Sequence, residues 1–250
     1  MIHSFLLIGQ SNMAGRGVAD ESVPPFGNDK NIRVLINGRW QKAWRPLNPD
    51  REKAGVCLAE SFAADYRLDH PDVQVGLIPC ADGGTGLDQW QPGEILFENA
   101  VHQLRFAMKS SVVAGILWHQ GEHECGDGKI ATYAPRLENI LGALQKEIGG
   151  QRVPVVIGAL GDYLKDYEPT EKFSRYGLVN EQLRRVASGE NRAFVPADGL
   201  VDKGDHLHFS GPSLIEFGHR YYRAYQTLKN PALTADLPAE QKELSAMELL

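Results

Sequence analysis

The chain has 250 residues, a formal net charge of −6, 42% hydrophobic residues and 23% charged residues. This composition excludes a disordered, fibrous or coiled-coil chain, and the length suits one large α/β domain. The acidic balance argues against nucleic-acid and anionic-membrane partners, because phosphate binding needs a concentration of Lys and Arg. The apolar run Phe5–Ile8 is too short to span a membrane and lacks a basic flank or cleavage site. We therefore expect a soluble, cytoplasmic chain, with a signal peptide removed before Met1 as the open alternative.

Short β-branched apolar runs alternate with helical patterns along most of the chain. The expected strands are Ser4–Ile8, Ile32–Ile36, Val73–Ile78, Val112–Trp118, Val153–Ala159 and Ala193–Pro196. The expected helices are Cys57–Leu68, Ile95–Lys109, Tyr133–Ile148, Phe173–Ala187 and Pro212–Leu228, the last capped by Ser210. This alternation predicts right-handed βαβ units and a three-layer α/β/α sandwich with a central, mainly parallel sheet.

Two segments depart from the alternation. Residues 18–49 are rich in Pro, Asn and Gly and predict an inserted loop region with a hairpin around Asn37-Gly38. Residues 229–250 predict a C-terminal tail with a short docked helix or a frayed end. We therefore expect a single domain over residues 1–228, followed by this tail.

Polar, Gly-rich segments follow the expected strands. Gly9–Asn12 follows the first strand, Ala81–Thr85 the third and His119–Glu122 the fourth, while Asp205–His208 precedes the final helix. In a parallel sheet, the loops at the carboxyl ends of the strands meet at one edge and hold the working residues. These four segments are therefore expected to form one site.

Ser11 and the pair Asp205 and His208 are the candidates for nucleophilic chemistry. A serine hydroxyl becomes a nucleophile when a general base takes its proton, and a position directly after a strand aims backbone N–H groups at a nearby oxyanion. The D-x-x-H spacing allows the carboxylate to bond one imidazole nitrogen and leaves the other as the base. A helix N-cap remains the alternative role for Ser11.

A zinc site is the main rival interpretation. His119, Glu122 and His123 match the H-x-x-E-H pattern of inverted zinc metalloproteases. That pattern needs a helix to bring its histidines onto one face, whereas here it follows a β-like run, and Gly121 disfavours a continuing helix. A zinc-dependent hydrolase is therefore kept only as the alternative.

The four segments together resemble the SGNH hydrolase superfamily, and within it the sialate O-acetylesterase-like and acetyl xylan esterase branch, carbohydrate esterase family 6. The matching blocks are Gly9–Met13 (GQSNM), Cys80–Thr85 (CADGGT) with a downstream Trp90, Trp118–Glu122 (WHQGE) and Asp205–Phe209 (DHLHF). They occur in the order of that family and span most of the chain. The residues after the third block, His123 and Glu124, depart from the Ser/Asn-Asp pair common there.

The resemblance implies a flavodoxin-like SGNH hydrolase fold and a serine esterase that removes O-acetyl groups from carbohydrates, without a metal or cofactor. It implies Ser11 as nucleophile, His208 as base and Asp205 as its acid partner, with Glu122 as the other candidate for that partner. The expected oxyanion donors are the Ser11 N–H, the Gly83 N–H, with Gly84 as the alternative, and the Gln120 side chain. Further expected substrate contacts are Asn12, Trp90 and His119.

Acetylated sialic acid and acetylated xylan fragments both fit the resemblance as substrates, and it leaves the oligomeric state open. A non-catalytic carbohydrate-binding module on the same fold is a further alternative. The presence of the Ser11, Asp205 and His208 set argues against it, because binding alone does not require a D-x-x-H pair.

Overall fold

The computed structural model describes residues 1–126, 128–150 and 152–229. Within these residues, seven strands form one sheet in the order β3-β2-β4-β1-β5-β6-β7. Neighbouring strands are parallel except for the antiparallel pair β2 and β3, which confirms a mainly parallel sheet. The strands are β1 (Ile2–Gly9), β2 (Ile32–Ile36), β3 (Arg39–Lys42), β4 (Gln74–Pro79), β5 (Val112–His119), β6 (Val155–Gly158) and β7 (Arg192–Val195).

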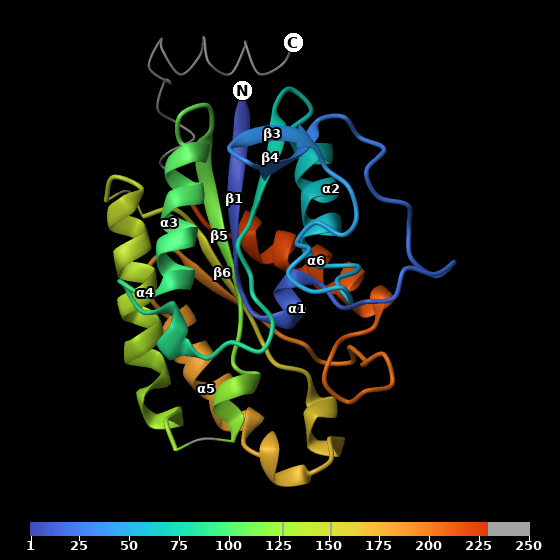
Figure 1. Ribbon diagram of the computed structural model, residues 1–250, viewed down its shortest axis with the longest axis vertical. Coiled ribbons are helices and arrows are strands. Elements are labelled where there is room, and N and C mark those ends of the chain that lie inside the picture. The colour runs from blue at the N-terminus through green and yellow to red at the C-terminus, as the bar shows by residue number, and fades with distance from the viewer. Residues whose placement is uncertain (127, 151, 230–250) are drawn as a thin grey trace.

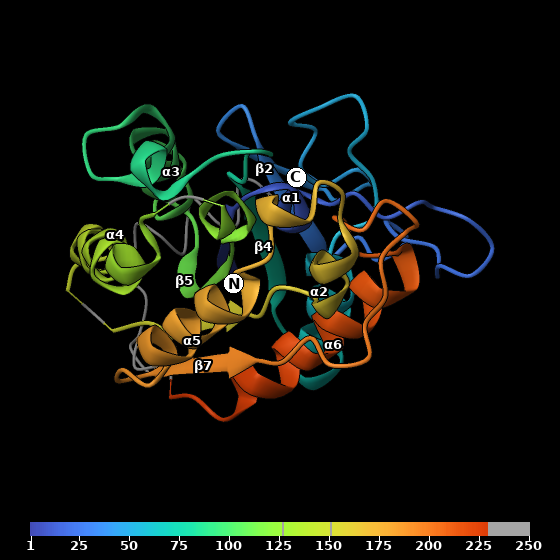
Figure 2. The ribbon, with the colours of Figure 1, turned by 90° about the horizontal axis from the view of Figure 1, so that it is seen from below.

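Helices cover both faces of the sheet, as the alternation predicts. One face carries α3 (Ile95–Ala107), α4 (Tyr133–Glu147) and α5 (Tyr176–Ala187), and the other carries α2 (Ala59–Asp69) and α6 (Gly211–Gln226), which pack together (Figures 1 and 2). The three-layer α/β/α sandwich is therefore confirmed. Shorter helical turns are α1 (Ser11–Ala14), η1 (Leu87–Trp90), η2 (Glu122–Cys125), η3 (Ile130–Thr132), η4 (Asp162–Asp166) and η5 (Thr170–Lys172).

The central strands are buried along nearly their whole length. Every residue of β1 is buried, and β5 is buried from its second residue onward. A strand covered on both faces reads as a continuous apolar run, which explains why these strands were visible in the sequence. Phe5 on β1 packs edge-to-face against Phe62 and Tyr66 of α2, with ring centroids 4.9 Å apart in each pair. These contacts fix α2 to the sheet.

The predicted hairpin is also present. Asn37 (φ 51°) and Gly38 (φ 74°) form the two-residue turn between β2 and β3, in the left-handed region that such turns require. Strands β2 and β3 form one edge of the sheet, so the region 18–49 contains two strands in addition to loops. The predicted C-terminal tail lies outside the described residues, apart from Lys229.

The helix ends differ from the prediction in one place that affects the site. The pattern over Phe173–Ala187 predicts one helix, whereas α5 begins at Tyr176 and Phe173 lies in the preceding loop. The predicted cap of α6 is confirmed, because Ser210 Oγ accepts a 3.3 Å hydrogen bond from the Ser213 N–H. No helix in the described ranges is long and apolar enough to cross a bilayer.

Candidate active site

The predicted polar segments converge at the carboxyl ends of β1, β4 and β5. The chain crosses from β1 to β4 on one side of β1 and then returns over it to β5 on the other side. Such a reversal leaves a crevice outside the strand ends, where α/β proteins place their ligands. In Figure 1, α1 lies at the lower end of β1, next to the lower ends of β4 and β5.

Gly9 makes the turn from β1 into α1. Its φ of 134° disfavours other residues, and a Cβ there would lie 2.0 Å from the His119 carbonyl oxygen. Gln10 caps α1 and donates its N–H to the same oxygen at 2.9 Å, so Ser11 is the first helical residue. Ser11 is therefore not the N-cap, and its hydroxyl is available for another partner.

Ser11, His208 and Asp205 form a hydrogen-bonded line. Ser11 Oγ lies 3.1 Å from His208 Nε2, and His208 Nδ1 lies 2.7 Å from Asp205 Oδ2. The other Asp205 oxygen accepts the N–H groups of His208 at 2.8 Å and of Leu207 at 3.1 Å. These bonds fix the Asp205 carboxylate, because Asp205, Leu207 and His208 lie in one short turn of the chain before α6. The geometry is that of a nucleophile, a base and the group that orients the base.

The environment keeps His208 neutral near pH 7. Burial lowers the pKa of His208 below its ordinary value of 6.5, and the charge of Lys203 acts in the same direction, whereas Asp205 and Glu122 oppose the shift without overcoming it. Burial acts to raise the pKa of Asp205, but the hydrogen bonds from the His208 side chain and backbone outweigh burial and leave that pKa below its ordinary value. An ionised Asp205 beside a neutral imidazole leaves the Nε2 lone pair facing Ser11.

Glu122 and Asn12 form a second buried pair beside this line. Asn12 Nδ2 donates to Glu122 Oε1 at 2.6 Å and to the Leu207 carbonyl at 3.3 Å, and Asn12 Oδ1 accepts from the Phe209 N–H at 3.1 Å. Asp205 therefore holds His208 Nδ1, whereas Glu122 holds Asn12. Asn12 is only 1% exposed and does not line the cavity, so it joins α1 to the His208 segment and has no open path to a substrate.

A cavity of about 400 Å³ opens above Ser11 and His208. It is large enough for a small ligand. Its walls combine polar groups with one phenyl ring, and cationic side chains line it. The lining residues are Gln10, Ser11, Arg16, Arg51, Lys53, Gly83, Gly84, Glu122, His123, Lys172, Phe173, Leu207 and His208.

The expected oxyanion donors differ in their availability. No described group accepts a hydrogen bond from the Ser11 or Gly84 N–H. The Gly83 N–H, by contrast, donates to Asp50 Oδ2 at 2.8 Å, and Gln120 is fully buried, with its amide bonded inside the protein. Of the two glycines, Gly84 therefore has the open N–H, and the Gln120 side chain does not reach the cavity.

Trp90 and His119 lie away from the cavity that they were expected to line. Trp90 is 1% exposed, donates its indole N–H to Thr85 Oγ1 at 3.0 Å and packs edge-to-face on Trp118. His119 is fully buried with Nε2 3.1 Å from the Ala159 carbonyl, and burial lowers its pKa. Both are core residues, because the strand and loop that carry them direct these side chains into the protein.

The zinc alternative gains no support from these positions. The β-like run before the H-x-x-E-H pattern is strand β5, and His119 is the last residue of this strand. His123 lies in the short turn η2 and lines the cavity. Across residues 1–126, 128–150 and 152–229, no three His, Cys, Asp or Glu side chains gather in a way that could hold a metal ion.

A family model described as carbohydrate esterase, sialic acid-specific acetylesterase matches residues 1–227. The chain belongs to this family. A relative from Arabidopsis thaliana, named "Probable carbohydrate esterase At4g34215", is 29% identical to this esterase in an alignment 244 residues long, which covers 88% of this chain and 89% of that protein.

Solved structures share the fold of this esterase. The X-ray structure of the Arabidopsis protein superposes with a TM-score of 0.78 at 25% identity, covering 90% of this esterase and 98% of that chain. XAC1771 of Xanthomonas citri, described as a novel carbohydrate acetylesterase, shares the fold with a TM-score of 0.68 at 17% identity, covering 94% of this chain and 57% of that one. This carboxylic ester hydrolase is thus a carbohydrate acetylesterase with an SGNH-like fold. Its narrower placement in carbohydrate esterase family 6 stays a prediction.

Several residues of the esterase site were not identified from the sequence. Arg16 and Asp50 form a buried ion pair with 2.6 Å between Nη2 and Oδ2, and Asp50 also holds Gly83. Lys172 and Phe173 reach the cavity from the loop before α5. No local pattern marks these residues, because their partners are distant in the sequence.

Proposed function

We propose that this esterase removes O-acetyl groups from carbohydrates through an acetyl-enzyme intermediate on Ser11. The observation that carries the proposal is the line from Ser11 Oγ to His208 Nε2 and from His208 Nδ1 to Asp205 Oδ2, which borders the cavity. A neutral imidazole at hydrogen-bond distance from a serine hydroxyl is the arrangement that nucleophilic ester hydrolysis needs.

In the first half-reaction, Ser11 Oγ attacks the acetyl carbonyl carbon while His208 Nε2 accepts the hydroxyl proton. The resulting oxyanion receives hydrogen bonds from the open N–H groups of Ser11 and Gly84. The carbon–oxygen bond to the sugar then breaks, and His208 returns the proton to the leaving sugar oxygen. In the second half-reaction, water, deprotonated by His208, attacks the acetyl-Ser11 ester and releases acetate. Asp205 holds the imidazole orientation and stabilises its cationic form throughout.

Cationic side chains at the cavity favour an acetylated sugar that carries a carboxylate. Arg16 is paired with Asp50 and Arg51 with Asp82 at 2.7 Å, whereas the exposed Lys53 has no ion-pair partner among the described residues. Lys172 Nζ lies over the Phe173 ring at 5.2 Å from its centroid and also lines the cavity. We expect Lys53→Gln and Lys172→Gln to raise KM for acidic acetylated sugars more than for neutral ones, since charge attraction is lost only with the former.

The decisive experiment measures acetate release from acetylated mono- and oligosaccharides by wild type and Ser11→Ala. Wild type is expected to turn over and to give an acetylated peptide containing Ser11 when the reaction is quenched early. Activity retained in Ser11→Ala would overturn the proposal. Saturable sugar binding without acetate release by the wild-type protein would instead support the non-catalytic binding module.

Asp205→Asn and Glu122→Gln form a matched pair, because each removes one carboxylate beside His208. Asp205→Asn is expected to lower kcat by about 10⁴-fold through the wrong imidazole tautomer, as in other triads. Glu122→Gln is expected to lower kcat far less, since Glu122 accepts a hydrogen bond from Asn12 and makes none with the His208 ring. The reverse order would make Glu122 the acid partner.

A further inference from the structure

A second cavity lies next to the active-site cavity, at the carboxyl ends of β2 and β4. Its volume is about 440 Å³, and its wall includes Ile36 and Asn37 at the end of β2 and Asp82 after β4. Arg51 lines both this second cavity and the cavity above Ser11. The two cavities are therefore neighbours that share one side chain.

Amide side chains make up much of the polar wall of the second cavity. They belong to Asn37, Asn48, Asn99 and Gln103. Asn99 and Gln103 are four residues apart on α3, so they project from the same face of this helix. The amides of Asn37, Asn99 and Gln103 have no hydrogen-bond partner among the described residues. Each of them offers both a donor and an acceptor to a ligand.

Asn48 adds an unpaired acceptor to the same wall. Its side chain is buried, with 6% of the residue exposed, and Nδ2 donates to the Ala81 carbonyl at 2.9 Å. Its Oδ1 has no hydrogen-bond partner among the described residues. Because a buried polar atom without a partner is unfavourable, a hydroxyl that reaches Asn48 from the cavity would stabilise it. The second cavity is therefore suited to a ligand rich in hydroxyl groups.

The charges at the second cavity are paired, which favours an uncharged ligand. Asp82 Oδ1 lies 2.7 Å from Arg51 Nη1. Asp50 Oδ2 lies 2.6 Å from Arg16 Nη2, and no other charged side chain of the described residues lines this cavity. The active-site cavity differs, because the exposed Lys53 there has no ion-pair partner among the described residues. A neutral group is thus favoured in the second cavity, and an anionic group in the active-site cavity.

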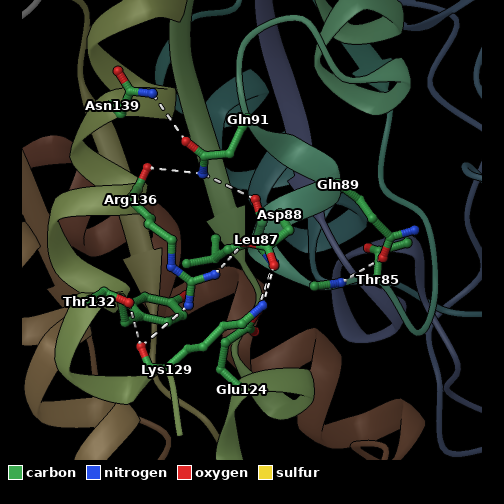
Figure 3. Close-up of polar contacts among 12 residues, drawn as sticks. Thr85, Leu87, Asp88, Gln89, Gln91, Glu124, Lys129, Thr132, Arg136 and Asn139 are labelled. Carbon is green, nitrogen blue, oxygen red and sulfur yellow. Dashed lines mark hydrogen bonds and ion pairs between the residues drawn. The ribbon is translucent and has the colours of Figure 1, made fainter. Parts of the chain in front are cut away.

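The wall that α3 contributes is held in place by contacts outside the cavity. The loop between β4 and α3 contains η1, which packs against α4. Arg136 Nη1 on α4 lies 2.9 Å from Asp88 Oδ1 on η1 (Figure 3). Asn139 Nδ2 donates to Gln91 Oε1 at 3.0 Å one turn further along α4 (Figure 3). The second cavity is therefore formed before any ligand arrives, as is usual for small-molecule sites.

The strand order determines which part of a substrate can reach the second cavity. β4 lies between β1 and β2, so the ends of β1 and β2 are separated by two strand spacings, or about 10 Å. A sugar whose acetyl group lies at Ser11 occupies the active-site cavity. The next sugar would pass over the Arg51 and Asp82 pair, where the Arg51 side chain is 49% exposed.

We propose that the second cavity is a subsite for an uncharged sugar linked to the acetylated one, so that the preferred substrates are oligosaccharides. This inference rests on the proposed deacetylation at Ser11. The amides of Asn99 and Gln103 bind hydroxyl groups of this second sugar. The half-buried side chains of Ile36 and Leu96 pack against the carbon face of its ring.

The test compares short and long acetylated sugars on the full chain. The probes are O-acetylated xylose with O-acetylated xylotriose, and free O-acetylated sialic acid with the same sugar linked to lactose. At least one longer probe is expected to show a higher kcat/KM than its shorter partner, mainly through a lower KM. Asn99→Ala and Gln103→Ala should each reduce this advantage by about 2- to 10-fold, the effect of one lost neutral hydrogen bond. Neither should change the kinetics on the shorter probes.

His102→Ala is the matched control, because His102 is exposed on α3 but does not line the second cavity. It should keep the full advantage of the longer probe. Equal kcat/KM for the two members of both pairs would overturn the inference. A loss in Asn99→Ala and Gln103→Ala that is the same for short and long probes would overturn it too.

Calorimetric titration of Ser11→Ala with the same probes separates this inference from failure of the proposed function. Ser11→Ala cannot form the acetyl-enzyme, but its second cavity is intact. Tighter binding of a longer probe, lost when Asn99→Ala is added, would support the subsite even if acetate release proved independent of Ser11. Equal binding of short and long probes would overturn the subsite even if Ser11 proved to be the nucleophile.

Discussion

Asp50 and Gly83 are joined by a 2.8 Å hydrogen bond from the glycine N–H to the Asp50 carboxylate. The same carboxylate makes a bidentate pair with Arg16, whose guanidinium lies in the wall of the cavity. A single aspartate therefore neutralises a buried cation and holds the loop after β4. Of Gly83 and Gly84, Gly84 is the one whose N–H has no acceptor among the described residues.

We predict that Asp50→Ala lowers the free energy of unfolding by about 3–5 kcal/mol, because it leaves the buried Arg16 charge without a partner. Adding Arg16→Met should restore part of the loss, since the uncompensated charge is then removed as well. Urea unfolding of the two single variants and the double variant measures both effects. If Asp50→Ala is as stable as wild type, the ion pair is not the main support of this loop.

The pH profile should report the environment of His208. Burial lowers the pKa of His208 below 6.5, and the base must be neutral to act. We therefore expect kcat/KM for an aryl acetate to rise with pH through a midpoint below 6.5 and then to level off. A midpoint above 6.5 would contradict the burial of this imidazole.

Two neighbouring charges should move that midpoint in opposite directions. Glu122 raises the pKa of His208 by stabilising the imidazolium, whereas Lys203 lowers it. Glu122→Gln should consequently shift the acidic limb to lower pH, and Lys203→Gln should shift it to higher pH. The two variants control for each other, because a general loss of structure would not give shifts of opposite sign.

The positions of Ser11, Asp205 and His208 were largely predictable from the sequence. Buried parallel strands appear as continuous apolar runs, so the residues just after them can be assigned to one edge of the sheet. The contact between Asp205 and His208 depends only on a three-residue spacing in one segment. Its prediction required no knowledge of the tertiary fold.

The remaining features depend on tertiary packing. Asp50 and Gly83 are 33 residues apart, and nothing local to either one indicates the bond between them. Gln120 follows a strand as expected, yet only its surroundings show that its amide points inward to Gln10. Trp90 likewise follows a polar loop but is buried, because an aromatic side chain there packs more favourably on Trp118 than in the cavity.

Asn12 is expected to stabilise the segment that carries His208. It bonds Glu122 Oε1, the Leu207 carbonyl and the Phe209 N–H. Asn12→Ala leaves these buried groups unpaired and should lower the free energy of unfolding by about 1–3 kcal/mol. It should also lower kcat, since the segment that carries His208 loses its link to α1.

Asn12→Asp is the matched comparison, because it keeps the shape but places a carboxylate against Glu122. We expect it to be less stable than Asn12→Ala near pH 7, since two buried carboxylates then face each other. Thermal unfolding of both variants and of the wild type gives their order of stability. An Asn12→Asp variant as stable as wild type would contradict the close contact of residue 12 with Glu122.

Treatment with a zinc chelator tests the alternative that the protein is a zinc-dependent hydrolase. His119 Nε2 faces the Ala159 carbonyl inside the protein, so His119 and His123 do not point to a common ion. Prolonged treatment with a zinc chelator should therefore leave ester hydrolysis unchanged, whereas a serine-directed organophosphate should abolish it. His119→Asn serves as a control variant and is expected to act on stability, because its imidazole fills a fully buried position. Activity that is lost with the chelator and restored by Zn²⁺ would overturn the assignment of Ser11 as the nucleophile.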